Sequence, residues 1–225
     1  MKAGIHLSRR AALVSLAGLV AGCGVKLPGG GARPQLFVLT PNAELPPDLP
    51  PVAWQLLVEQ PVSPAALDTP RIAVAYSPIE IDYFARANWT DRPPDMVQRL
   101  IVEAFENSRR IVGVGRDAIG LRSDFLLKTD LRDFQAEYQG RPATTDGLPQ
   151  GGGLPVAHIR INAKLVKLPQ RVIVASRTFE ARVTAERNDM SGIVMAYDTG
   201  LGQAIGDLVA WTLVEGETII RKSDD

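Results

Sequence analysis

The stretch from residue 157 to residue 186 constrains the fold most, because apolar and polar side chains alternate along both of its halves. From 157 to 165 every second residue is apolar, and from 179 to 185 the same alternation returns after a turn at Pro169-Gln170. A period of two is the period of a β-strand with one face buried and the other in water. Two such strands joined by a short turn predict an antiparallel hairpin in a sheet that is covered on one side only.

Two segments have the helical period and could supply the cover for that sheet. Residues 93–108 and 197–214 repeat apolar side chains at three- and four-residue spacing, which places them on one stripe of a helix. The stripe residues are Val97, Leu100, Ile101, Ala104 and Phe105 in the first helix and Leu201, Ala204, Ile205, Leu208 and Trp211 in the second. The pattern predicts an α+β fold, a two-layer sandwich in which two helices pack on one face of a mainly antiparallel sheet.

Two finer features bear on how these layers fit together. The alternation in residues 124–138 changes phase partway, which would expose the core face of a regular strand, so we expect a β-bulge near Arg132–Asp133. The second helix contains Gly200, Gly202 and Gly206, each of which costs a helix about 1 kcal/mol relative to alanine. Their presence predicts close packing of the helix backbone on the sheet.

The amino terminus has the composition of an export signal. Lys2, Arg9 and Arg10 precede an uncharged run at 11–22, which is shorter than the roughly 20 apolar residues that cross a bilayer. The run ends in Val20-Ala21-Gly22-Cys23, which resembles a bacterial lipobox and contains the only cysteine of the chain. This resemblance implies cleavage between Gly22 and Cys23, acylation of the Cys23 thiol and of the new amino group, and hence a lipid anchor. Ser8-Arg9-Arg10 leaves open whether export follows the general or the twin-arginine route.

The segment after the cysteine reads as a spacer. Residues 24–33 are rich in glycine and predict a flexible tether. Gly24 stands where lipoproteins retained in the inner membrane carry aspartate, a pattern that resembles outer-membrane lipoproteins. The predicted organisation is a signal peptide at 1–22, a lipidated cysteine and tether at 23–34, a folded domain at 35–215 and a charged tail at 216–225.

Composition excludes several classes of function. The 25 basic and 25 acidic side chains cancel, which argues against a nucleic-acid binder. One cysteine and two histidines exclude a zinc site built from several thiolates and a histidine-rich metal centre. We therefore expect no cofactor and no metal.

His158 and Trp89 are the individual side chains that need an interpretation. His158 shares a strand face with Arg160 and Lys164, cationic neighbours that do not suit a catalytic base, so we expect a surface histidine without a catalytic role. Trp89 lies in an expected turn at 85–92, where tryptophan either caps the core or anchors an interface. The core position is favoured, and the interface remains the alternative.

The order of these elements resembles a known family. A lipobox is followed by Leu36-Phe37-Val38-Leu39, by the aromatic segment 81–89 before a helix, by 124–134, and by a strand pair and a closing helix near Trp211. From Gln35 to Val214 this layout resembles the ABC-type transport auxiliary lipoproteins, the PqiC-like auxiliary subunits of MCE-type lipid transport systems. The resemblance implies partnership with an MCE-domain protein in the periplasm and, indirectly, with an inner-membrane permease and its ATPase.

Three functions follow as hypotheses. The first is a non-enzymatic docking or adaptor subunit, held at the periplasmic face of the outer membrane by Cys23. The second is a periplasmic carrier that holds acyl chains between sheet and helices, and the third is a lipoprotein hydrolase. A homo-oligomer is compatible with each of them, because a sheet with one wet face leaves edges available.

Overall fold

The structure, a computed structural model, describes residues 33–116, 123–138, 143–145, 148–150 and 153–224. Residues from Pro34 onward form a unit of their own. Its helices are α2 (Pro93–Ser108) and α3 (Met190–Asp224). Its strands are β1 (Gln35–Phe37), β2 (Val52–Val58), β3 (Arg71–Ser77), β4 (Glu80–Trp89), β5 (Ile111–Arg116), β6 (Phe125–Glu137), β7 (Ala143–Thr145), β8 (Leu148–Gln150), β9 (Val156–Lys167) and β10 (Val172–Thr184).

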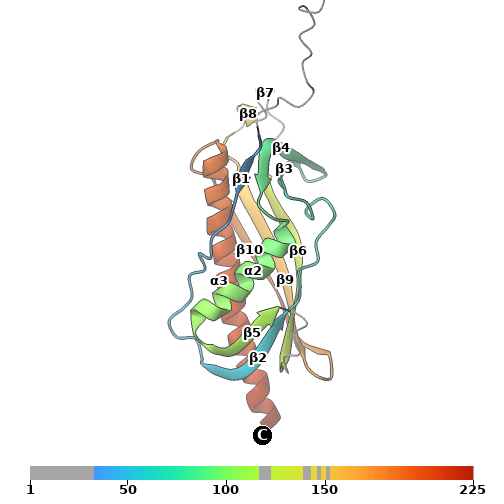
Figure 1. The fold of residues 1–225 in the computed structure, drawn as a ribbon, viewed down its shortest axis with the longest axis vertical. Coiled ribbons are helices and arrows are strands. Elements are labelled where there is room, and N and C mark those ends of the chain that lie inside the picture. Colours follow the sequence, from blue (N-terminus) through green and yellow to red (C-terminus); the bar gives the residue numbers. More distant parts are fainter. Residues whose placement is uncertain (1–32, 117–122, 139–142, 146–147, 151–152, 225) are drawn as a thin grey trace, which may run out of the picture. The chain divides into compact units, whose positions relative to one another are not determined.

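The long strands β6, β9 and β10 lie side by side in an eight-stranded sheet and pair antiparallel (Figure 1). One edge of β6 pairs with β9 along its whole length, while its other edge pairs in parallel with β2 near its start and with β3 near its end. Strand β4 joins β3 antiparallel, and β1 and β5 add parallel pairs at the margins. The sheet is thus mixed, and the predicted α+β sandwich is confirmed.

Both the predicted hairpin and the predicted bulge are present. Strands β9 and β10 pair from Val172 opposite Lys167 to Thr184 opposite Val156. The register between β6 and β9 shifts between Leu131 and Asp133, at the position where the sequence alternation changes phase. The extra residue keeps the apolar side chains on both sides of it turned toward the helices.

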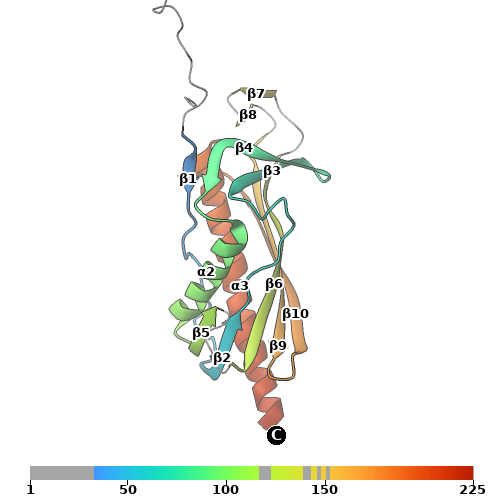
Figure 2. The same cartoon turned by 45° about the vertical axis from the view of Figure 1, so that its right-hand side comes forward.

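Helices α2 and α3 cover one face of the sheet, and no described helix lies on the opposite face of β6, β9 and β10 (Figure 2). Helix α2 has the predicted bounds and begins at two prolines, which suit a first turn whose N–H groups have no partner within the helix. Between the layers the rings of Trp89, Phe134 and Tyr197 form a triangle with centroid separations of 5.1–5.8 Å. These aromatic contacts fill the space between sheet and helices near the end of β4.

Trp89 belongs to this core. The expected turn at 85–92 is wrong in its first part, because β4 continues through Trp89, whose N–H donates to the carbonyl of Pro70. The residue is 1% exposed, so the core alternative describes its position and an interface anchor at this residue does not. The alternation stops here because β4 is irregular: Arg86 has a left-handed φ of 58°, and the register with β3 shifts between Tyr83 and Asn88.

Helix α3 is longer at both ends than the predicted 197–214. It begins at Met190, where the Asp189 carboxylate accepts a hydrogen bond from the N–H of Gly192 at 2.7 Å, a typical helix cap. It continues to Asp224, so most of the expected charged tail is helical. Ile219 and Ile220 pack against the core and explain this continuation. None of the helices in the described ranges is long and apolar enough to cross a membrane.

The helix glycines allow close packing, but only partly on the sheet. A Cβ atom at Gly200 would lie 2.8 Å from the Ile159 side chain of β9, as predicted. At Gly202 and Gly206 it would instead meet backbone carbonyls of Asn42 and Glu44. Asn42 and Glu44 belong to the proline-rich segment 41–51 between β1 and β2, which we call the connector. This connector therefore lies along α3, a contact that the sequence did not indicate.

Candidate functional site

The predicted lipid-attachment site falls outside the described residues. Gly22 and Cys23 belong to the range 1–32, so cleavage between them and acylation of Cys23 stay predictions. The described surface offers a second candidate, the helix-free face of the sheet together with the β3–β4 hairpin beside it.

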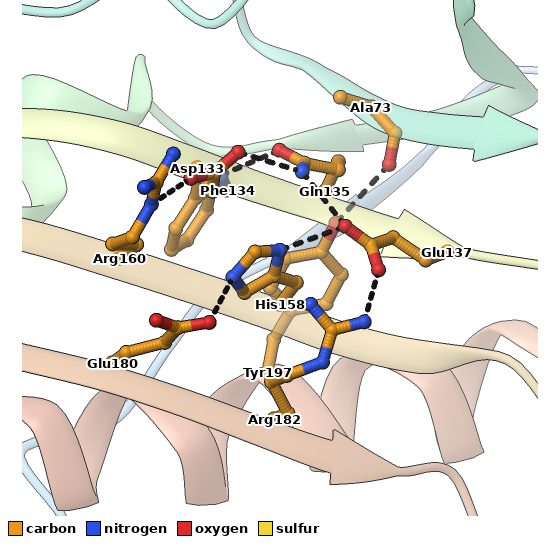
Figure 3. Close-up of polar contacts among 10 residues, drawn as sticks. All are labelled: Ala73, Asp133, Phe134, Gln135, Glu137, His158, Arg160, Glu180, Arg182 and Tyr197. Carbon is orange, nitrogen blue, oxygen red and sulfur yellow. Dashed lines mark hydrogen bonds and ion pairs between the residues drawn. The ribbon is translucent and has the colours of Figure 1, made fainter. Parts of the chain in front are cut away.

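The helix-free face presents a network of polar side chains on three adjacent strands, drawn in part in Figure 3. These side chains occupy the outward positions of the alternating pattern, while their neighbours in sequence enter the core. We call this set the polar ladder, and it comprises Asp130, Asp133, Gln135 and Glu137 on β6, His158, Arg160 and Lys164 on β9, and Glu180 and Arg182 on β10.

His158 lies at the centre of the polar ladder between two carboxylates (Figure 3). Its Nδ1 is 2.7 Å from Oε1 of Glu137, and its Nε2 is 2.9 Å from Oε1 of Glu180. The residue is only 7% exposed because side chains of β6 and β10 flank it. The expected cationic surroundings of His158 are therefore wrong, because Glu137 of β6 and Glu180 of β10 contact its ring.

The carboxylates of β6 bind several further donors. Glu137 pairs with Arg182 and His158, and Asp133 pairs with Arg160. The side-chain amide of Gln135 donates a hydrogen bond to Glu137 at 3.1 Å and one to Asp133 at 3.0 Å. Partial burial by itself would raise the pKa of Glu137, but the hydrogen bonds from His158, Arg182 and Gln135 outweigh burial and hold that pKa below its ordinary value. The pKa of Asp133 is likewise lowered, with burial opposed by Gln135 and Arg160.

A cleft of about 820 Å³ opens between this ladder and the β3–β4 hairpin. In the described part of the chain, strands β3 and β6 pair at Val74–Ala136 and Ala75–Glu137, and β3 then turns into β4. The hairpin then projects on the side away from the helices (Figures 1 and 2). The lining combines apolar and charged side chains, among them Leu67, Tyr76, Ile81, Arg132, Glu137 and Arg182.

The rim of the cleft carries an unusual apolar tip. Ile79 in the β3–β4 turn is 96% exposed, and Ile81 at the start of β4 is 43% exposed. Scattered apolar residues on a surface are ordinary, but two isoleucines at the tip of a projecting hairpin beside a cleft form a compact contact point. In the sequence these isoleucines alternate with Glu80 and Asp82, a pattern of a half-buried strand that gives no sign that Ile79 lies in solvent.

The chemistry available on this face favours binding over catalysis. Both ring nitrogens of His158 already face carboxylates, so neither is directed at a hydroxyl or thiol that could act as a nucleophile. Within the described ranges no group of three or more histidine, cysteine, aspartate or glutamate residues could hold a metal ion.

Comparison with known proteins points to one family. The family model described as the ABC-type transport auxiliary lipoprotein component matches residues 36–209. A crystal structure of the Xanthomonas campestris protein XCC0632 is similar with a TM-score of 0.74 and 33% sequence identity, covering 83% of this chain and 99% of that one. A second crystal structure, 14% identical with a TM-score of 0.59, shares the fold over 79% of this chain and 97% of its own.

A curated relative extends further than this chain. The Bradyrhizobium diazoefficiens protein bll6063 is 27% identical over 204 residues, which cover 88% of this chain. The match spans 50% of the length of that relative, about half.

Proposed function

Because the chain belongs to the ABC-type transport auxiliary lipoprotein family, we propose that it is a non-enzymatic docking subunit of an MCE-type lipid transport system. In this proposal the chain is anchored at the periplasmic face of the outer membrane and binds an MCE-domain protein that bridges the periplasm. The inner-membrane permease and ATPase are then indirect partners. The observation that carries the docking role is the open cleft with Ile79 exposed at its rim.

The anchor rests on Cys23 and the tether that follows it. Several acyl chains hold a protein on a bilayer far more firmly than one chain does. A flexible segment of the length of 24–33 has a mean reach of roughly 17 Å, which lets the domain clear the lipid headgroups. Replacing Cys23 with serine should move the protein from the membrane fraction to the soluble fraction or block its processing. Unchanged processing and membrane association would refute the anchor.

The choice of membrane has its own test. Gly24→Asp should shift the protein from the outer to the inner membrane in density fractionation, while Gly24→Ala should leave the distribution unchanged. An inner-membrane location of the unmodified protein would overturn the outer-membrane part of the proposal and leave the docking part standing.

Docking is tested by photo-crosslinking from the hairpin tip in intact cells. A photoreactive residue at position 79 should form an adduct with the MCE-domain protein, identified by mass spectrometry. The matched control is position 195 on α3, where Met195 is 59% exposed but lies on the helical layer. An adduct with the MCE-domain protein from position 195 and none from position 79 would refute docking through this rim.

The packing of the core disfavours the carrier alternative. Trp89, Phe134 and Tyr197 occupy the space between sheet and helices where acyl chains would have to lie. Opening that space would require separation of close-packed rings. Solvent extraction of the purified protein followed by lipid mass spectrometry should recover no stoichiometric lipid, because the covalent acyl groups stay on the protein, whereas one bound phospholipid per chain would restore the carrier hypothesis.

A further inference from the structure

Arg132 is the extra residue of the bulge in β6. The register between β6 and β9 passes from Leu131 opposite Ile161 to Asp133 opposite Arg160, so residue 132 has no counterpart on β9. Leu131 is buried in the core, whereas Arg132 is exposed. Bulges are frequent beside functional sites. Here the added side chain lines the cleft between the polar ladder and the β3–β4 hairpin.

Arg132 lacks the close ion pair that the cations of the polar ladder have. Arg160, Lys164 and Arg182 each have a carboxylate oxygen within hydrogen-bond distance. Among the described residues, the one carboxylate paired with Arg132 is that of Asp130, whose oxygen is 3.9 Å from Nη2, too far for a hydrogen bond. That carboxylate already accepts a hydrogen bond from Lys164 at 2.9 Å. The Arg132 guanidinium, with its five N–H donors, therefore has capacity for a further acceptor.

The acidic side chains of the cleft do not cancel this charge. Asp133 and Glu137 are bound by arginines of their own chain, and Glu80 is not free either. The fields of such matched pairs are largely balanced at a distance, so the excess charge of Arg132 acts at short range, once a partner has entered the cleft. A contact of this kind contributes to the specificity of binding.

Apolar side chains line the cleft together with Arg132. Leu67 and Tyr76 are buried lining residues, and Ile81 is 43% exposed on the side of the hairpin. An apolar side chain of a partner that covers Ile81 removes apolar surface of both proteins from water, which is favourable. A segment that fits the whole lining therefore combines an apolar residue with a carboxylate.

We propose that Arg132 binds the carboxylate of an aspartate or glutamate in the docked segment of the MCE-domain protein, with an apolar residue of that segment beside it against Ile81. A guanidinium and a carboxylate match in geometry and form two parallel hydrogen bonds, an arrangement that lysine does not reproduce. This inference rests on the proposed docking at the cleft and adds the chemistry of the segment that docks there.

The segment is identified by photo-crosslinking within the cleft. A photoreactive residue at position 81 of the full-length lipoprotein should form an adduct with the MCE-domain protein in intact cells. Mass spectrometric mapping of the adduct should find an aspartate or glutamate within a few residues of the cross-linked position. A mapped segment without an acidic residue would overturn the inference, as would an adduct with a lipid or with a second copy of this chain.

Substitution at position 132 measures the contribution of the guanidinium. Arg132→Gln should lower the yield of the position-81 adduct about tenfold, the loss expected for a charged hydrogen bond, and Arg132→Lys should lower it less. The matched control is Arg99→Gln on α2, where the guanidinium is similarly exposed and lies 3.7 Å from the Glu103 carboxylate. The control should leave the yield unchanged. Neither glutamine variant should change Tm appreciably, since exposed ion pairs contribute little to stability.

Charge reversal separates this contact from docking itself. Arg132→Glu should reduce the adduct further, and replacement of the mapped acidic residue of the partner by arginine should restore it. Unchanged yields in Arg132→Gln and Arg132→Glu, with the position-79 adduct intact, would refute the role of Arg132 and leave docking at the rim standing. The lack of any adduct from positions 79 and 81 in the otherwise unmodified chain would instead refute the proposed function, and this inference with it.

Discussion

Replacement of Gly206 in α3 by alanine has two opposing effects on stability, a gain in helix propensity and a loss from overpacking. Alanine should stabilise a helix interior by about 1 kcal/mol relative to glycine. A Cβ at position 206, however, would lie 2.5 Å from the carbonyl oxygen of Glu44, a backbone atom that cannot rotate away. The connector is held nearby, since Thr40 donates its N–H and its hydroxyl to the Asp198 carboxylate, both at 2.7 Å. Retreat of Glu44 is therefore resisted.

Overpacking costs about 1–3 kcal/mol, and an approach of 2.5 Å to a backbone atom places this contact at the upper end of that range, about 2–3 kcal/mol. After the helix gain of about 1 kcal/mol is subtracted, we expect Gly206→Ala to lower the free energy of unfolding by roughly 1–2 kcal/mol. For a domain of this size that corresponds to a fall in Tm of about 2–8 °C. Urea and thermal denaturation followed by circular dichroism would measure it. Gln203→Ala, at an exposed position three residues earlier on α3, serves as the control and should change Tm little. A Gly206→Ala protein as stable as the unmodified chain would refute the contact between α3 and the connector.

Three further changes test the core, the polar ladder and the hairpin tip. Trp89→Ala should cost about 3–5 kcal/mol of unfolding free energy, and Tm should fall accordingly; an interface residue would leave Tm unchanged. Glu137→Gln should cost about 2 kcal/mol near pH 7, where the ionised carboxylate accepts hydrogen bonds from His158 and Arg182. The folded-state pKa of Glu137 is lowered, so the stability that its carboxylate contributes is complete above the unfolded-state pKa and is lost as the pH falls through the folded-state pKa. The free energies of unfolding of the unmodified protein and of Glu137→Gln should therefore become equal in acid. Ile79→Ser should leave Tm within experimental error while weakening co-purification with the MCE-domain protein, and a large loss of stability would contradict its exposed position.

The sequence predicted correctly those elements whose evidence lies within their own residues. Helix α2 was found at its observed bounds because proline at its start and an apolar stripe both lie within 93–108. The bulge at Leu131–Asp133 was predictable because a phase change within one strand is visible in sequence. In both cases the evidence is confined to a few neighbouring residues.

Features that depend on distant partners were missed. The last turns of α3 look like a charged tail until Ile219 and Ile220 are seen against the core. The surroundings of His158 were misjudged because its acidic neighbours, Glu137 and Glu180, lie 21 and 22 residues away along the chain. Strand register brings these side chains together, and register follows from the pairing of β6, β9 and β10 as a whole.

The two faces of the sheet are stabilised by different means, and this difference decides where a partner can bind. The inner face is filled by rings that fit one another, so it has no room for another molecule without loss of packing. On the outer face the carboxylates of Glu137 and Asp133 are matched by cations of the same chain, which leaves little net field to attract a charged partner. The apolar tip at Ile79 is one of the exposed apolar features that no part of the described chain covers, and it lies beside the cleft.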